Sequence, residues 1–331
     1  MITHRSLWTM MLLGCIGLIA GSAGAQQAMT RWLDPAVTEF KTVASGNSDY
    51  HFHTESKDQR RDFAMHEYDF DFTHPVYQKD GTVYALTTNI HVLDIATSTI
   101  LPDTGTRMPD HLWDVRFGGA ARWVLEDNWT LAAYLQVGSA SDKPFDSADE
   151  LAVMAAVGLR IPVRRDDGLV FLLQYSNTRD FLEGVPIPGI AYEWNPNDDL
   201  QILFGVPFSA VDWQFAEKWR LEASYFIPRT VDAKVSYDAT DRLTVYSGFS
   251  WDGKGFFRSD RTDDDHRLQF YQKRVTGGLK IKLTRQAAVD LFGGYAFDRF
   301  FFEGEDYDDR GFNRVSLADG AFVGAKLSFR F

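Results

Sequence analysis

Acidic and aromatic side chains alternate in one short stretch of this chain, and this stretch is the first part of it that could do chemistry. Residues 66–72 read His-Glu-Tyr-Asp-Phe-Asp-Phe, so Glu67, Asp69 and Asp71 share one phase while aromatic residues take the other. Successive side chains of a strand point to opposite faces. The stretch therefore predicts a strand with one carboxylate face and one aromatic face.

Charges of both signs gather on the same phase when this alternation is followed along the chain. Such a phase can line a water-filled pore that selects solutes by size and sign. It can also pair its charges into a narrow interior that conducts little, and the sequence leaves both interpretations open. No long loop stands out as a constriction folded into the lumen. The candidate pore-lining residues are Glu67, Asp69, Asp71, Asp114, Arg116, Arg122, Arg160, Arg220, Glu222, Lys280, Lys282, Asp290, Lys326 and Arg330, and Asp298 falls on the same phase.

Two acidic loops, at residues 259–266 and 303–311, carry oxygen ligands of the kind that Ca²⁺ and Mg²⁺ prefer. The run Asp-x-Asp-x-Arg-Gly at residues 306–311 approaches an EF-hand loop but has Arg310 at the fifth position. Solvated loops are the simpler interpretation. We therefore assign no metal site and expect no cofactor.

Nucleophilic catalysis has little support in the sequence. The run Gly-Phe-Ser-Trp-Asp at residues 248–252 lacks the last glycine of the G-x-S-x-G motif, which in any case belongs to another fold. No histidine and serine stand at a distinctive spacing. We assign no catalytic residue.

The elements that must position these charges are strands with a period of two, separated by turns. Short turns alternate with connections that are usually longer, as in outer-membrane barrels. We expect a first strand at residues 37–44, long polar loops at 45–62 and 252–265, and sixteen strands in all, or fourteen if the short pair around Pro207 is absent. The short turns lie near residues 78–82, 125–128, 164–168, 195–199, 216–218, 238–241 and 284–286.

Composition fits an all-β membrane protein better than a helical one. Hydrophobic residues are 45% of the chain and the mean hydropathy is −0.25. Only every second residue of a barrel strand meets lipid, so its average stays polar. Tryptophans beside the short turns predict an interfacial girdle, and the net charge of −12 argues against nucleic acid as a partner. These tryptophans are Trp123, Trp129, Trp194, Trp213 and Trp219.

The first residues have the pattern of a secretory signal. His4 and Arg5 precede an apolar run over residues 7–20, and a small-residue cleavage site follows near Ala25. Cys15 invites a lipoprotein interpretation, but the apolar core continues beyond it. We expect residues 1–25 to be a signal peptide, residues 26–36 a short periplasmic lead-in and residues 37–331 one barrel domain.

The chain closes on a strand-like pattern. Residues 321–331 read Ala-Phe-Val-Gly-Ala-Lys-Leu-Ser-Phe-Arg-Phe, with Phe329 and Phe331 on the apolar phase. This ending resembles the final strand of Gram-negative outer-membrane β-barrels. The resemblance implies that both residues form an assembly signal, which the barrel-assembly machinery reads.

A further resemblance covers about residues 190–257. The chain resembles an uncharacterised family of bacterial outer-membrane β-barrel proteins, known as a domain of unknown function. The resemblance implies architecture and location, and it supplies no substrate. The residues that carry it are Phe204-Gly205-Val206-Pro207, Trp219-Arg220-Leu221-Glu222, Tyr225-x-x-Pro228 and Asp241-Arg242-Leu243-Thr244-Val245.

We therefore expect a single antiparallel transmembrane β-barrel in a Gram-negative outer membrane, in contact with its lipid and lipopolysaccharide. The leading hypothesis is a passive channel for small hydrophilic solutes and not an enzyme. The alternative is a non-conducting structural or ligand-binding barrel. A lipid-modifying enzyme is the third hypothesis.

Overall fold

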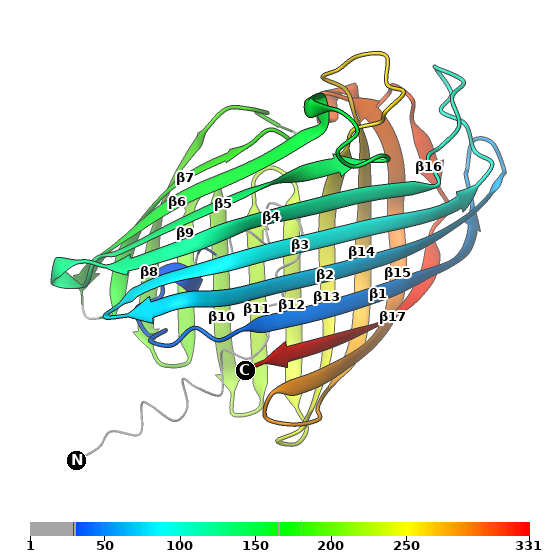
Figure 1. Ribbon diagram of the computed structural model, residues 1–331. Coiled ribbons are helices and arrows are strands. Elements are labelled where there is room, and N and C mark those ends of the chain that lie inside the picture. The colour runs from blue at the N-terminus through cyan, green and yellow to red at the C-terminus, as the bar shows by residue number, and fades with distance from the viewer. Residues whose placement is uncertain (1–28, 30, 165, 180) are drawn as a thin grey trace.

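The computed structural model describes residue 29 and residues 31–164, 166–179 and 181–331 (Figure 1). The predicted signal peptide, with Cys15 and the cleavage site, lies outside the described residues. Within the described part of the chain, no helix is long and apolar enough to cross a membrane.

Sixteen long strands and one short strand make up the described fold. The short strand, β16 (Val315–Leu317), adds three residues beside β15. The long strands are β1 (Val43–Glu55), β2 (Asp62–Lys79), β3 (Thr82–Thr97), β4 (His111–Val124), β5 (Thr130–Ser141), β6 (Leu151–Arg164), β7 (Asp167–Ser176), β8 (Ile187–Asn197), β9 (Leu200–Val206), β10 (Phe208–Ala216), β11 (Trp219–Phe226), β12 (Thr230–Asp238), β13 (Leu243–Phe256), β14 (Arg267–Lys282), β15 (Ala287–Gly304) and β17 (Gly320–Arg330).

The long strands close on themselves into one antiparallel barrel. Each pairs with its neighbours in sequence, β15 pairs with β17, and β17 pairs back onto β1 from Val43↔Arg330 to His51↔Phe322. Closure gives every edge a hydrogen-bonding partner. The predicted sixteen-strand antiparallel barrel is confirmed, including the short pair that meets at Pro207.

The seven predicted short turns all lie at one end of the barrel, where β17 also ends, and the longer loops lie mainly at the other. We call these the short-turn end and the long-loop end. Four of the predicted girdle tryptophans, each 38–45% exposed, lie beside the short turns: Trp129, Trp194, Trp213 and Trp219.

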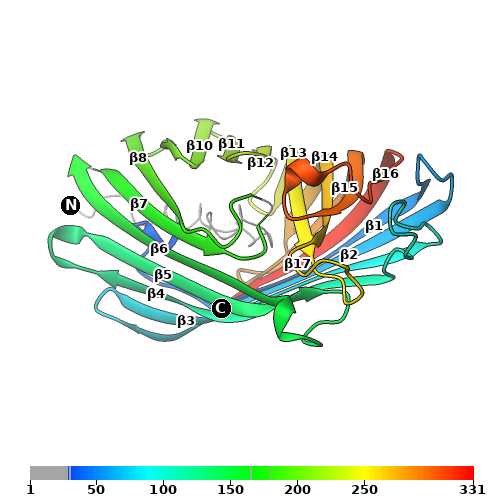
Figure 2. The ribbon, with the colours of Figure 1, turned by 90° about the horizontal axis from the view of Figure 1, so that it is seen from above.

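The outer surface of the wall carries an apolar band. Phe117, Leu135, Val157 and Leu173 follow one another on β4 to β7, and each is about half exposed. They occupy the phase opposite to the polar inward residues. Figure 2, the view from above, shows β3–β5 on one side of the lumen and β8 and β10–β12 on the other.

The wall is much taller on one side than on the other. Strands β2 and β15 have 18 residues each, whereas β9 has 7 and β11 has 8. At about 3.3 Å per residue, β2 is roughly 60 Å long and β9 roughly 23 Å. The tall side therefore carries the large loops well beyond the short side.

Three predicted boundaries are wrong. The first strand is β1 at Val43–Glu55 instead of residues 37–44, so most of the expected polar loop at 45–62 is strand. The expected loop at 252–265 begins later, because β13 continues to Phe256. The cause is the same in both places: polar residues such as Asn47 and Asp252 face the lumen, so the apolar alternation is missing.

Candidate functional site: the lumen of the barrel

The strand registers place all fourteen candidate residues on the inward phase. Whether they line a pore stays a prediction. Asp298, which we also predicted to be on the inward phase, is an exception, and that prediction is wrong. It lies at a register shift in β15 with a φ of 50°, and its carboxylate contacts the outward Lys273 Nζ at 2.6 Å.

Glu67 lies at the centre of a cluster that joins strands four and five positions apart in the wall. Its Oε1 atom contacts His51 Nε2 at 3.0 Å and accepts a hydrogen bond from Gln272 Nε2 at 2.9 Å. Lys254 Nζ lies 3.7 Å from Glu67 Oε2. Because Gln272 and Lys254 belong to β14 and β13, these contacts narrow the lumen between those strands and β1–β2.

Asp69 and His91 continue this cluster on β2 and β3. His91 Nδ1 lies 2.7 Å from Asp69 Oδ1, and Lys254 Nζ lies 3.1 Å from His91 Nε2. The histidine is 1% exposed. Lys254 Nζ is equally close to the other ring nitrogen of His91, Nδ1, at 3.1 Å, and it lies 4.0 Å from Asp69 Oδ1, so the three side chains form one contact group.

Arg274 on β14 and Asp49 on β1 form a further ion pair between strands that are not neighbours. Their Nη1 and Oδ2 atoms are 2.8 Å apart, and the guanidinium lies over the Phe322 ring at 5.2 Å from its centroid. Gly324 leaves room for the Asp49 carboxylate in this contact. A Cβ atom on Gly324 would lie 2.7 Å from Asp49 Oδ1.

The inward residues of β2–β8 form a packed, largely buried half of the lumen, which we call the packed half. Arg116 donates two hydrogen bonds to Asp114, at 2.6 and 2.8 Å, and Arg160 pairs with Glu193. Asp71 accepts a hydrogen bond from Asn89. Four of these six residues are buried, and the side chains of Arg116 and Asp114 are less than a fifth exposed.

The N-terminal segment, residues 31–42, fills the short-turn end of the packed half. Its Leu33 and Phe40 are buried against small inward residues of β3–β6. Arg122 donates hydrogen bonds to the carbonyl oxygens of Val37 and Asp34 and lies 5.4 Å from the Phe40 ring centroid. The small inward residues are Ala85, Ala120, Ala132 and Ala156.

The inward charges of β10–β12 are different because water reaches them. We call this side, together with the short-turn ends of β13–β17, the open half. Lys234 Nζ contacts Glu222 at 2.9 Å, and Arg220 pairs with Asp212. These four side chains are 23–33% exposed. Lys280, Asp290, Lys326 and Arg330 extend the partly exposed surface around the wall.

Loops cross the long-loop end above the central cluster. The segment after β13 crosses to β5, which lies eight positions away in the ring of sixteen: Phe257 N donates to Ala140 O at 2.7 Å. Arg258 then pairs with Glu303 at 3.0 Å. Leu101 and Met108, from the connection between β3 and β4, complete an apolar core below this crossing.

These inward loops were missed in the sequence. Their signal is modest: Leu101 and Met108 are apolar residues within a long polar connection. In the acidic loop at 303–311, carboxylates accept hydrogen bonds from the backbone, whereas in an EF-hand loop they bind a cation. Asp306 and Asp309 accept backbone hydrogen bonds and cap a single turn, η3 (Tyr307–Asp309). Among the described residues, no group of three His, Cys, Asp or Glu side chains could hold a metal ion.

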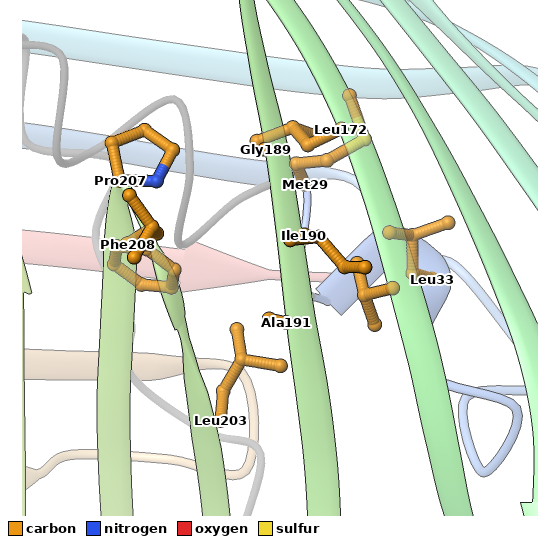
Figure 3. Close-up of a pocket in the computed structure, with 11 residues that line it drawn as sticks. Met29, Leu33, Leu172, Gly189, Ile190, Ala191, Leu203, Pro207 and Phe208 are labelled. Carbon is orange, nitrogen blue, oxygen red and sulfur yellow. The ribbon is translucent and has the colours of Figure 1, made fainter.

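An apolar pocket separates the N-terminal segment from β7–β10 (Figure 3). Met29 and Leu33 lie on one side, and Leu172, Leu203 and Phe208 lie on the other. The pocket offers apolar contact and none of the charges found elsewhere in the lumen. It separates the packed half from the shortest part of the wall.

The similarity of this chain to known proteins is distant. No family model matches the sequence, and no curated protein matches it. Among solved structures, an outer membrane channel from Pseudomonas putida F1 is 12% identical over 88% of this chain and 95% of that one, with a TM-score of 0.39. The Pseudomonas putida toluene transporter TodX is 10% identical over 95% and 92%, with a TM-score of 0.43. A Pseudomonas aeruginosa FadL homologue is 11% identical over 90% and 92%, with a TM-score of 0.41. Because identity is this low, function has to be inferred from the residues of this chain.

Proposed function

We propose that this protein is an outer-membrane β-barrel that acts as a passive channel for small hydrophilic solutes. A closed barrel satisfies its backbone hydrogen bonds internally, and an apolar outer band with a polar interior suits a lipid bilayer. The observation that carries the proposal is the contrast between buried and water-exposed inward charges. The ion pairs of β10–β12 are exposed to water inside a wall that is otherwise packed.

The proposed route follows the open half from the short-turn end. Solutes would pass Arg220 and Asp212, then Glu222 and Lys234, and would meet charges of both signs. Selectivity would then depend on lumen width and on local sign. The loops above the central cluster define a closed state, and opening requires the crossing held by Phe257 and Arg258 to move.

A location in the outer membrane implies contact with the barrel-assembly machinery, with lipid and with lipopolysaccharide. Phe329 and Phe331 are 37% and 57% exposed at the end of β17. An accessible aromatic end is suited to recognition by the barrel-assembly machinery. The apolar band would contact outer-membrane lipid, and the exposed polar residues of the tall side would reach the lipopolysaccharide.

The test is single-channel recording of refolded protein in a planar bilayer, with heat-modifiable migration as the control for folding. We expect small, infrequent steps for the natural chain and larger, longer steps when residues 258–265 are replaced by a short Gly-Ser turn. Folded barrels that stay silent in both forms would overturn the proposal.

Ion selectivity identifies the route. Lys234→Glu replaces a partly exposed cation of the open half, so we expect the reversal potential in a salt gradient to move toward cation selectivity. Arg116→Gln is the matched control, because Arg116 is held by Asp114 within the packed half. An unchanged reversal potential in Lys234→Glu would place the current elsewhere.

The alternative function, a non-conducting barrel that binds ligands at its surface, is favoured by one observation. The bridges from Lys254 and Arg274 cross the lumen below a closed mouth. Under this alternative, loop replacement abolishes binding of a surface ligand and leaves the membrane silent. The same recordings therefore separate the two functions.

A further inference from the structure

A serine, a histidine and a tyrosine are linked by hydrogen bonds on the outer surface of the barrel. Ser48 lies on β1, and His66 and Tyr68 lie on β2. Their inward neighbours, Asp49 and Glu67, occupy the opposite phase. The three side chains therefore face away from the lumen, toward the surroundings of the barrel.

The geometry matches the first requirement of an activated nucleophile. Ser48 Oγ lies 2.9 Å from His66 Nε2, within the range for a nucleophile and its general base. On the other side of the ring, His66 Nδ1 lies 2.8 Å from the Tyr68 hydroxyl. In the tautomer with its proton on Nδ1, His66 donates to Tyr68 Oη and accepts from Ser48 Oγ–H.

Aromatic rings hold the imidazole in place. The Tyr68 ring centroid lies 4.2 Å from that of His66, and the Tyr50 ring packs against it edge-on at 5.7 Å. Tyr50, Phe52 and Tyr68 are 36–45% exposed around the pair. Such rings are typical of the boundary between acyl chains and headgroups.

Outward charges begin beside His66. Asp94 on β3 is its direct register partner and contacts His111 Nδ1 at 3.4 Å on the outer face of β4. Toward the short-turn end, the outward residues are apolar, including Phe70 at 43% exposure. The pair thus lies where the outer surface changes from apolar to charged.

We propose that Ser48 and His66 form a second site, which hydrolyses carboxylic esters of membrane lipids. This inference rests on the proposed membrane location but does not depend on conduction. Ester carbonyls of lipids lie between headgroups and acyl chains. Tyr50, Phe52 and Tyr68 on the apolar side and Asp94 on the charged side mark that level on the barrel surface. The apolar surface below the pair would hold the acyl chain.

The reaction balances with the groups present, a lipid and water. Ser48 Oγ attacks the ester carbonyl while His66 Nε2 takes the hydroxyl proton. The C–O bond to the alcohol breaks, and His66 returns the proton to the leaving lysolipid. Water then attacks the acyl-serine with His66 as base, and the fatty acid leaves as the proton returns to Ser48.

Turnover should be slow. The two hydrogen bonds above are the only side-chain hydrogen bonds that Ser48 and His66 make among the described residues. Loss of one oxyanion donor costs about 10²- to 10³-fold in enzymes that have such donors. The most sensitive readout is therefore covalent labelling of the nucleophile.

The experiment treats the purified, folded full chain with a fluorophosphonate probe and maps the labelled residue by mass spectrometry. Release of fatty acid from phosphatidylcholine in mixed micelles is measured in parallel. We expect labelling at Ser48, at least tenfold weaker labelling in His66→Gln, and loss of both labelling and hydrolysis in Ser48→Ala. Tyr68→Phe should lower the rate several-fold and change its pH profile.

The chain offers a control pair beside the same two strands: Thr42 directly precedes β1, and His74 lies on β2. Thr42 Oγ1 lies 2.8 Å from His74 Nδ1 near the short-turn end. Thr42→Ala and His74→Gln therefore disrupt a similar hydroxyl–imidazole pair that lies away from Tyr50, Phe52 and Tyr68. Both variants should keep labelling and hydrolysis. Absence of labelling in the folded natural chain, or hydrolysis that persists in Ser48→Ala, would overturn the inference. Bilayer recordings of Ser48→Ala should match the natural chain, so failure of the lipid site and failure of the channel are distinguishable.

Discussion

The packed and open halves of the lumen are built from the same alternating strands but use their inward positions differently. On β3–β6, alanines at inward positions leave room for the N-terminal segment, and the charged residues Arg122 and Arg160 beside them are buried. On β10–β12, long charged side chains take those positions and stay in contact with water. One architecture therefore yields a buried support on one side of the lumen and a partly exposed charged surface on the other.

The largest effect is expected when one cation is removed from each half of the lumen, in two separate variants. Arg160→Met leaves Glu193 uncompensated in the packed half, where both side chains are less than 10% exposed, and breaking a buried pair costs about 4 kcal/mol. Arg220→Met breaks a partly exposed pair, which is worth about 0–1 kcal/mol. Denaturant unfolding of refolded barrels in micelles measures both changes. Equal losses would show that the two halves do not differ in this way.

A smaller change should release the N-terminal segment. Phe40→Ala removes a buried ring that packs against Trp32 at 4.6 Å and lies below Arg122, and loss of such a ring costs about 3 kcal/mol of packing. We expect the segment to undock before the barrel unfolds, so limited proteolysis should cut near residues 34–42. Phe215→Ala, at an outward aromatic residue of the open half, is the control and should leave that region protected.

The sequence predicted the wall well because the wall repeats. A period of two, seven short turns and an apolar final strand suffice to place sixteen strands and the inward phase. They fail at β1, where Asn47, Asp49 and His51 face the lumen without an apolar pattern opposite to them. They also fail at Asp298, because a local shift in register cannot be read from alternation.

The site is less predictable than the wall because its contacts join distant strands. Lys254 and His91 are 163 residues apart, yet they meet across the lumen. Ser48 and His66 become neighbours only through the register of β1 with β2. A search for spacing along the chain cannot find such pairs, whereas a correct register for β1 would have brought Ser48 beside His66.

The smallest expected effect tests how closely the packed half is filled. A Cβ atom on Gly158 of β6 would lie 2.8 Å from Leu33 Cδ1, so Gly158→Ala should displace the N-terminal segment at a cost of about 1 kcal/mol. Gly46 on β1 has no atom within 4 Å of the corresponding position, and alanine is favoured over glycine within a strand by about 0.5–1 kcal/mol. Gly46→Ala should therefore raise the unfolding midpoint, whereas Gly158→Ala should lower it. If Gly158→Ala left both the midpoint and the proteolysis pattern unchanged, the segment would not be docked against β6, and the packed half would be open to water like its counterpart.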